Sequence, residues 1–229
     1  MSRTEDEYAS LLFPLLEYAG LKAVGWEAIV ICSVVPPVER TLDAFCRIYL
    51  KHAPFKIHAG LEIGFSFDVE VPAEVGADRL ANGAYAVKHL KLPAVVVDLG
   101  TATTFDVVTA DRVYHGGLIM PGVRMGVEAL GSKTSKLPMV DLEYPPSVIG
   151  RSTVDCIRSG ILYGYLEAMN GLLDRLDTEL GGLGDIALTG GLAPLFKARM
   201  RRSVKWLPNL TLDGAEIIYR QSQRTGNPG

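Results

Sequence analysis

The sequence predicts an α/β protein, because strand-like and helical segments alternate along the chain. The clearest strand signal is the β-branched run Val95–Val97, which suits a buried strand. The clearest helix signal lies between Thr153 and Leu180, where apolar residues recur at helical spacing and form a broad buried face. Strands connected through helices of this kind favour a layered α/β architecture over an all-helical or all-strand one.

The N-terminal part is expected to begin with a helix that covers Tyr8 to Ala19 and stops at Gly20. A strand over Glu27–Val35 follows and is closed by Pro36-Pro37. The other elements expected in this part are a helix over Val38–Leu50, strand-like pieces between Phe55 and Val71, and a helix over Gly76–Leu90.

The C-terminal part is expected to be built on a β-hairpin. Its strands are Val95–Val97 and Phe105–Val108, and Leu99–Thr104 is expected to link them. The elements expected after the hairpin are a strand over Val113–Met120, a short helix over Val123–Leu130, the long helix from Thr153, a strand over Asp185–Leu188 and a closing helix over Ala215–Gln221.

Composition indicates a soluble globular protein of the cytoplasm. The 229 residues are 48% hydrophobic and 21% charged, and 23 basic against 26 acidic side chains give a formal net charge of -3. This balance gives no electrostatic reason to expect nucleic acid or an anionic membrane as a partner. Cys32, Cys46 and Cys156 are odd in number and widely spaced, which favours a reducing compartment. We expect neither a signal peptide nor a membrane-spanning segment.

The hairpin carries residues that suit a phosphate-and-cation loop. Gly100 lets the backbone turn tightly and lets a ligand approach its N–H groups. Thr101, Thr103 and Thr104 add hydroxyls that can bind phosphate oxygens or a cation. The carboxylate of Asp98 would repel phosphate unless a cation lies between them. An ordinary hairpin, in which these side chains bond their own backbone, explains the residues equally well.

Gly76-Ala77-Asp78-Arg79 places an acid beside a base where a helix should begin. A carboxylate there can accept a proton from a substrate hydroxyl, and the planar fork of Arg79 can hold an anionic group. Without further context, a helix cap at Asp78 beside a surface arginine is the more common explanation.

Two more element ends are candidates for ligand contacts. Ser152-Thr153 opens the long helix, where it can serve as a simple N-cap, bind an anion, or do both. Thr189-Gly190-Gly191 follows a strand, and its glycines would admit a nucleotide close to the backbone.

A series of longer motifs indicates a family. They are, in order, SRTEDEYASLL (Ser2 to Leu12), SVVPP (Ser33 to Pro37), EVGADRLAN (Glu74 to Asn82), DLGTATTFDVV (Asp98 to Val108), GGLIMPG (Gly116 to Gly122), KLP (Lys136 to Pro138), PPSVIGRST (Pro145 to Thr153) and TGGLAP (Thr189 to Pro194). With these motifs the chain resembles the type III pantothenate kinases of the actin-like kinase superfamily, a family that also resembles the Bvg accessory factors. The combination of GADR with DxGTATT some twenty positions later is the most specific part of the resemblance.

The resemblance implies a pantothenate site. Asp78 matches the family's proton acceptor, which activates the primary hydroxyl of pantothenate. Gly76, Ala77 and Arg79 match the substrate-binding positions around it, and Thr153 matches a further substrate contact.

The resemblance also implies an ATP and cation site. Asp98 matches the residue that helps to hold a monovalent cation, potassium or ammonium, and Thr101 matches an ATP contact. Gly100 and Thr103 are expected to contribute to the same ATP site, with Mg²⁺ on the phosphates. The implied reaction is the transfer of phosphate from ATP to pantothenate, which gives 4′-phosphopantothenate in the first step of coenzyme A biosynthesis.

The implied fold is that of the actin-like ATPases, with two ribonuclease-H-like domains, here residues 1–93 and 94–229. A homodimer is implied as well, because the active site of the family lies at a dimer interface. The family's first phosphate loop, Asp-x-Gly-Asn-Thr, occurs nowhere in the sequence, so the first domain is expected to be incomplete at its N-terminus. A misassigned start, a truncation or a true loss would each explain this, and we favour the first.

Two other functions stay open at this point. One is a non-catalytic regulatory or binding protein on the same fold, which the missing first phosphate loop favours and the intact Asp78, Asp98 and Thr101 oppose. The other is a sugar or acetate kinase of the actin-like superfamily, which the GADR and PPSVIGRST motifs oppose.

Overall fold

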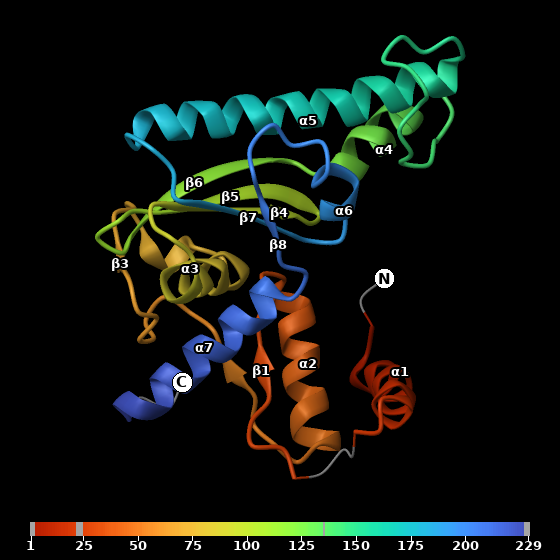
Figure 1. Cartoon of the computed structure of the whole chain (residues 1–229). Helices are drawn as coiled ribbons and strands as arrows, with labels where there is room; N and C mark the ends of the chain where they lie inside the picture. The colour runs from red at the N-terminus through yellow and green to blue at the C-terminus, as the bar shows by residue number, and fades with distance from the viewer. Residues whose placement is uncertain (1–2, 22–24, 135, 227–229) are drawn as a thin grey trace. The chain divides into compact units, whose positions relative to one another are not determined.

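The computed structural model describes residues 3–21, 25–134 and 136–226, and these form two compact units (Figure 1). One unit consists of the chain up to Phe65, of Glu70–Tyr85 and of the chain from Thr211 onward. The other consists of Ser66–Val69 and Ala86–Leu210. The units are defined by contacts between residues, and each combines separate stretches of the chain. The division into residues 1–93 and 94–229 therefore stays a prediction.

The first unit begins with helix α1 (Glu5–Tyr18), which confirms the first predicted helix. Its N-terminus is a capping box, in which the hydroxyl of Thr4 accepts from the N–H of Glu7 and the Glu7 carboxylate accepts from the N–H of Thr4. Helix α2 (Pro36–Tyr49) packs against α1, and the rings of Phe13 and Phe45 lie 6.0 Å apart. Both prolines that were expected to close a strand therefore open this helix, a position that suits their fixed φ.

The strand predicted over Glu27–Val35 was wrong in length. Strand β1 covers only Val30–Ile31 and pairs in parallel with β2 (Phe55–Lys56). A strand extends only as far as its partner offers backbone groups, and β2 offers two residues. The remaining elements that contribute to this unit are the 3₁₀ helix η1 (Pro72–Glu74), helix α3 (Ala77–His89) up to Tyr85 and helix α7 (Leu210–Thr225) from Thr211.

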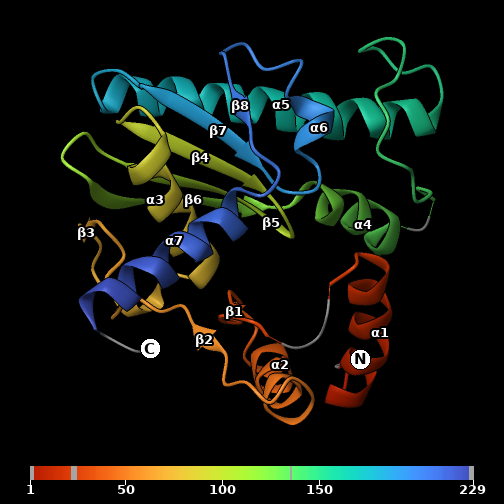
Figure 2. The ribbon, with the colours of Figure 1, turned by 60° about the horizontal axis from the view of Figure 1, so that its bottom comes forward.

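The second unit is organised on a six-stranded sheet of order β3-β6-β5-β4-β7-β8 (Figure 2). Strands β4 and β5 form the predicted antiparallel hairpin, and β4 also pairs in parallel with β7. The strands are β3 (Ser66–Phe67), β4 (Ala94–Leu99), β5 (Ala102–Val108), β6 (Val113–Pro121), β7 (Asp185–Thr189) and β8 (Lys205–Trp206).

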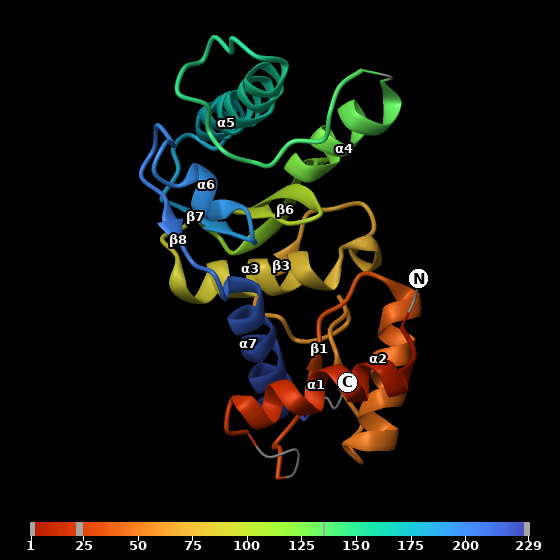
Figure 3. The same cartoon turned by 90° about the vertical axis from the view of Figure 1, so that its right-hand side faces the viewer.

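The core of this unit lies between the sheet and helix α5 (Thr153–Glu179), which runs along one face of it (Figure 1). Helix α4 (Val123–Lys133) lies on the same side of the sheet and contacts α5 (Figure 3). The core residues from the sheet and from α5 are Val95, Val97, Leu99, Phe105, Val107, Ile186, Leu188, Leu162, Leu166, Met169 and Leu173. Burial of this apolar face is the main stabilising contribution to the unit.

The hairpin turn is tighter than the sequence predicts. Strand β4 extends to Leu99 and β5 begins at Ala102, so only Gly100 and Thr101 lie between the strands. The linker predicted over Leu99–Thr104 was therefore wrong, because Thr103 and its neighbour pair in the ladder. Threonine is as well suited to a strand as to a loop, which is why its side chain did not mark the boundary.

Helices α3, α4 and α5 confirm the predicted helices, and the closing helix is longer than predicted. The sequence analysis missed the one-turn helix α6 (Ala193–Phe196) and the two-residue strand β8. Among the described residues, none of the helices combines the length and apolar character that a membrane crossing requires.

Candidate active site

A cavity of about 370 Å³ lies beside the turn of the β4–β5 hairpin. It is lined by three stretches of the second unit: the turn itself, the first turns of α4, and the loop that follows β7. The lining residues are Leu99, Gly100, Thr101, Arg124, Met125, Glu128, Gly191 and Leu192. Ligands of open α/β sheets bind outside the carboxyl ends of the strands, and this cavity lies at the carboxyl ends of β4 and β7.

The carboxylate of Asp98 lies close to the backbone at two positions, Gly100 in the hairpin turn and Gly190 after β7. Asp98 pairs with Thr189 in the parallel ladder, so the chain after β7 passes next to it. A Cβ at position 190 would stand 2.6 Å from Oδ1 of Asp98, and a Cβ at position 100 would stand 3.5 Å from it. Gly190, with a φ of +86°, therefore leaves the space that the carboxylate occupies.

The turn is supported by the corner between β6 and α4. Gly122 is the N-cap of α4, and a Cβ at this position would overlap the carbonyl oxygen of Thr101. The hydroxyl of Tyr165, on α5, lies 3.0 Å from the carbonyl oxygen of Pro121 and 3.1 Å from that of Gly122, so it can donate to either. Burial raises the pKa of Tyr165, which keeps this donor protonated. The hairpin turn and the start of α4 are therefore packed directly against each other.

Of the predicted ATP-site residues, the structure brings Asp98, Gly100 and Thr101 together at this turn. Gly100 and Thr101 are exposed and line the cavity. Thr103 does not line it: the side chain is wholly buried, and in the described part of the chain its hydroxyl has no hydrogen-bond partner. Its face of β5 is the core face, which it shares with Phe105.

Asp78 lies in the first turn of α3, in the first unit. Its Oδ1 accepts a hydrogen bond from the N–H of Arg79 at 2.8 Å. A Cβ at position 76 would stand 2.6 Å from the same oxygen, so Gly76 makes room for the carboxylate. Asp78 is the second residue of α3, so this bond lies within the first turn of the helix and not at the N-cap position, and the side chain is partly exposed.

The neighbours of Asp78 differ in exposure. Ala77 is buried, at 7% exposed. Arg79 is half-buried. The four residues Gly76 to Arg79 are together because they are consecutive.

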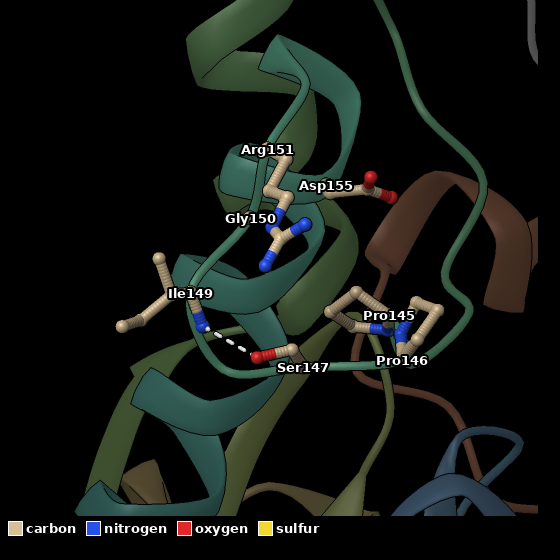
Figure 4. A pocket seen from close by; sticks show the side chains of 7 residues that line it. All are labelled: Pro145, Pro146, Ser147, Ile149, Gly150, Arg151 and Asp155. Carbon is tan, nitrogen blue, oxygen red and sulfur yellow. Dashed lines mark hydrogen bonds between the residues drawn. The ribbon is translucent and has the colours of Figure 1, made fainter.

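Thr153 is the first residue of α5 and is exposed. The N-cap is Ser152, whose hydroxyl oxygen accepts from the N–H of Asp155 at 3.1 Å, so the capping explanation holds for the serine. A second cavity, of about 390 Å³, lies at this helix end and includes Arg151 and Asp155 (Figure 4). Its loop is shaped in part by Ser147, which accepts from the N–H of Ile149. Thr153 does not line the cavity beside the hairpin.

Several residues that line the hairpin cavity or support its turn were not predicted from the sequence. Gly122 lies within the GGLIMPG motif, but only its contact with Thr101 shows what the glycine does. Arg124 and Glu128 lie four residues apart on one helix face, and nothing in their spacing distinguishes them from solvated surface residues. Tyr165 lies in the helix predicted from Thr153, and its position in that helix does not reveal that its hydroxyl lies 3.0 Å from the carbonyl oxygen of Pro121.

Comparison with known proteins identifies the family of this chain. The sequence profile of the type III pantothenate kinase family matches residues 1–175. The chain is 41% identical over 221 residues to the type III pantothenate kinase of Dehalococcoides mccartyi, an alignment that covers 96% of this chain and 86% of the relative. It is 40% identical over 222 residues to that of Anaeromyxobacter sp. (strain K), which covers 97% and 87% of the two chains.

The fold is also found among solved structures. A Baf family protein of Campylobacter jejuni, described as a transcriptional activator, superposes with a TM-score of 0.62 over 92% of this chain and 89% of that one, at 16% identity. The fold predicted from the sequence, an α/β protein of the actin-like ATPase class, is confirmed. The chain belongs to the type III pantothenate kinase family.

Proposed function

We propose that this chain transfers the γ-phosphoryl group of ATP to the primary hydroxyl of pantothenate and so forms 4′-phosphopantothenate, the first step of coenzyme A biosynthesis. The observation that carries the proposal is the hairpin turn of Gly100 and Thr101, which lines a cavity next to the carboxylate of Asp98. Membership of the family indicates pantothenate as the substrate, and the turn is proposed to bind the phosphates of ATP.

The residues at the turn fit the polyphosphate of a nucleotide. Gly100 and Gly190 have no side chain to fill the space beside Asp98, and Thr101, which carries a hydroxyl, is exposed and lines the cavity. Gly100, Thr101 and the loop at Gly191 would hold the phosphates. MgATP supplies the group that is transferred, and Mg²⁺ neutralises charge on the phosphates.

The position of Asp98 explains why a monovalent cation would be needed. A carboxylate next to bound phosphates repels them unless a cation lies between. Potassium or ammonium bound at Asp98 would neutralise this repulsion. We therefore propose Asp98 as the ligand of the monovalent cation, with backbone or hydroxyl oxygens as its further ligands.

On the substrate side, we propose Asp78 as the acceptor of the proton that leaves the hydroxyl of pantothenate. Phosphoryl transfer passes through a loose transition state, so the acceptor needs correct placement more than strong basicity. Gly76 leaves room for the Asp78 carboxylate, and the N–H of Arg79 holds one of its oxygens. Arg79, the backbone of Ala77 and the hydroxyl of Thr153 would contact pantothenate.

The rest of the family's arrangement is proposed on the resemblance. It comprises a homodimer that completes the active site, a cytoplasmic location and two ribonuclease-H-like domains, residues 1–93 and 94–229. No disulfide joins the three cysteines, in keeping with a reducing compartment. The non-catalytic alternative is not favoured, because the family profile and the relatives that match this chain are those of type III pantothenate kinases.

The test is a direct assay. The purified chain is incubated with MgATP, pantothenate and potassium, and the product is sought by mass spectrometry, with sodium as the control salt. We expect potassium-dependent phosphopantothenate from the parent chain and roughly 10²–10⁴-fold slower formation from Asp78→Asn. Asp213→Asn is the matched control, since Asp213 is also an exposed acid in the first turn of a helix. A folded dimer that forms no product would overturn the proposal.

A further inference from the structure

Arg124 is the one basic residue among the eight that line the hairpin cavity. It lies in the first turn of α4, two residues after Gly122, and its side chain is exposed. Within the residues that the structure describes, Arg124 forms no ion pair. None of the sequence motifs includes it.

We propose that Arg124 binds the phosphates of the nucleotide in this cavity. The inference rests on the proposed function, since it takes ATP as the ligand. It adds a second element, α4, to the hairpin turn that the resemblance implies as the phosphate site.

Helix α4 is held in a fixed position against the hairpin turn. Gly122 contacts the carbonyl oxygen of Thr101 without an intervening side chain. Tyr165 reaches the carbonyl oxygens of Pro121 and Gly122 from α5. Arg124 follows this anchored corner by two residues, so the start of its side chain is placed next to the turn by packing and not by a flexible loop.

The charges around Arg124 at the start of α4 favour an anion in the cavity. The first turn of α4 contains no acidic residue, and a cation near a helix N-terminus is disfavoured by the helix dipole. Glu128 is four residues away on the same helix, but an arginine that precedes a glutamate is the weaker order for such a pair, and the two form no ion pair here. An anion in the cavity would compensate both effects at once.

Arg124 also balances the negative charge that the cavity would otherwise present to a polyphosphate. Glu128 lines it and Asp98 lies beside it, so the fixed charge without Arg124 would be negative. The guanidinium carries a permanent charge and a planar fork of donors that matches two phosphate oxygens. Arg124 thus supplies the fixed positive charge that the turn of glycine and threonine lacks.

The experiment compares Arg124→Ala and Arg124→Lys with the parent chain. Arg175→Gln is the matched control, because Arg175 is an exposed residue of α5 for which no ion pair is formed in the described part of the chain. Binding of MgATP, inorganic tripolyphosphate and adenosine is measured by calorimetry in the absence of pantothenate. The KM values for ATP and pantothenate are then measured separately.

We expect Arg124→Ala to weaken the binding of MgATP and of tripolyphosphate by about tenfold, the loss of one charge-assisted hydrogen bond. Adenosine binding and the KM for pantothenate should stay as in the parent. Arg124→Lys should recover part of the loss, since it restores the charge but not the fork. Arg175→Gln should bind all three ligands as the parent does.

Unchanged tripolyphosphate binding in Arg124→Ala, in a chain that still makes phosphopantothenate, would overturn the role of Arg124 alone. Equal losses for adenosine and tripolyphosphate would also overturn it, because they would indicate a distorted cavity. A parent chain that neither binds nucleotide nor makes product would overturn the proposed function together with this inference.

Discussion

Asp98 lies in β4 and Gly190 directly follows β7, some ninety positions later, yet the backbone at Gly190 lies directly against the Asp98 carboxylate. A Cβ at position 190 would stand 2.6 Å from Oδ1 of Asp98 and equally close to the backbone of Leu99. The parallel pairing of β4 with β7 therefore creates the space next to the hairpin turn, and a single methyl group would fill it.

The Gly190→Ala change should damage the site and the fold together. Alanine at a φ of +86° is strained, and its methyl group has no room, so we expect a loss of about 1–3 kcal/mol in the free energy of unfolding. Urea unfolding measures this loss, and the potassium dependence of activity reports on Asp98. Gly171→Ala, on α5 with no atom near the added methyl group, should be neutral or stabilising. Equal stability of both variants would contradict this account of Gly190.

Replacement of Asp78 should separate its two contributions. Asp78→Asn keeps an oxygen for the N–H of Arg79, so its stability should match the parent while turnover falls by roughly 10²–10⁴-fold. Asp78→Ala should lose turnover as well as about 1 kcal/mol of stability, because the N–H of Arg79 loses its acceptor. Thermal unfolding combined with the kinase assay separates the effects. Substantial turnover in Asp78→Asn would remove the side chain from the proton transfer.

Asp98→Asn should change the response to potassium. The neutral amide neither attracts a cation as strongly nor repels phosphate as strongly. We expect the potassium concentration for half-maximal activity to rise by about tenfold or more, or the dependence to disappear. Activity is measured against potassium at constant ionic strength. An identical curve for parent and variant would show that the cation binds elsewhere.

Tyr165→Phe removes the donor that serves the corner before α4. The carbonyl oxygens of Pro121 and Gly122 lose a partner at 3.0 and 3.1 Å, so we expect a loss of about 1 kcal/mol in stability. Because this corner supports the hairpin turn, the KM for ATP should rise while that for pantothenate is unchanged. Tyr163→Phe, at a neighbouring position of α5, is the control. A Tyr165→Phe enzyme with parental KM for ATP would show that the hydroxyl only stabilises the fold.

Asp185 should contribute to loss of stability in acid. Burial by itself would raise the pKa of Asp185, but hydrogen bonds from Lys205 at 2.6 Å and from the N–H of Lys91 at 2.7 Å hold that pKa below its usual value of 3.8. The carboxylate therefore adds stability that is present above about pH 4 and is lost as the pH falls through the lower, folded-state pKa.

The variant Asp185→Asn should accordingly be less stable than the parent at pH 7, by about 1 kcal/mol. The difference should shrink as the pH falls below about 4, because the parent loses its own carboxylate there. Urea midpoints at a series of pH values measure it. A difference that stays constant down to pH 3 would mean that the ion pair with Lys205 contributes nothing.

Local patterns were enough to predict the main elements of the second unit. The run Val95–Val97 is buried as expected, and the apolar spacing after Thr153 predicted α5 closely. The boundary of the hairpin was harder, since Thr103 suits a loop or a strand and only the pairing with Leu99 assigns it. Strand β1 was overestimated because apolar character reports burial and not the length of the partner.

The site could be predicted only as far as its residues are consecutive. Gly76 to Arg79 and Asp98 to Thr101 each form one local motif, so the sequence indicated them directly. The contacts of Asp98 with Gly190 and of Tyr165 with Gly122 join distant segments. Such contacts depend on strand order and helix packing, which no local pattern specifies.

The contact between Gly122 and Thr101 restricts how this protein can evolve. A Cβ at position 122 would meet the carbonyl oxygens of Thr101 and Gly100, and these are backbone atoms that every residue possesses. No substitution at position 101 or 100 can therefore compensate for a side chain at position 122. Position 122 therefore depends on the backbone at positions 100 and 101, but no change at those positions can offset a change at 122. Descendants that keep this turn must keep the glycine at position 122, whatever else changes around the cavity.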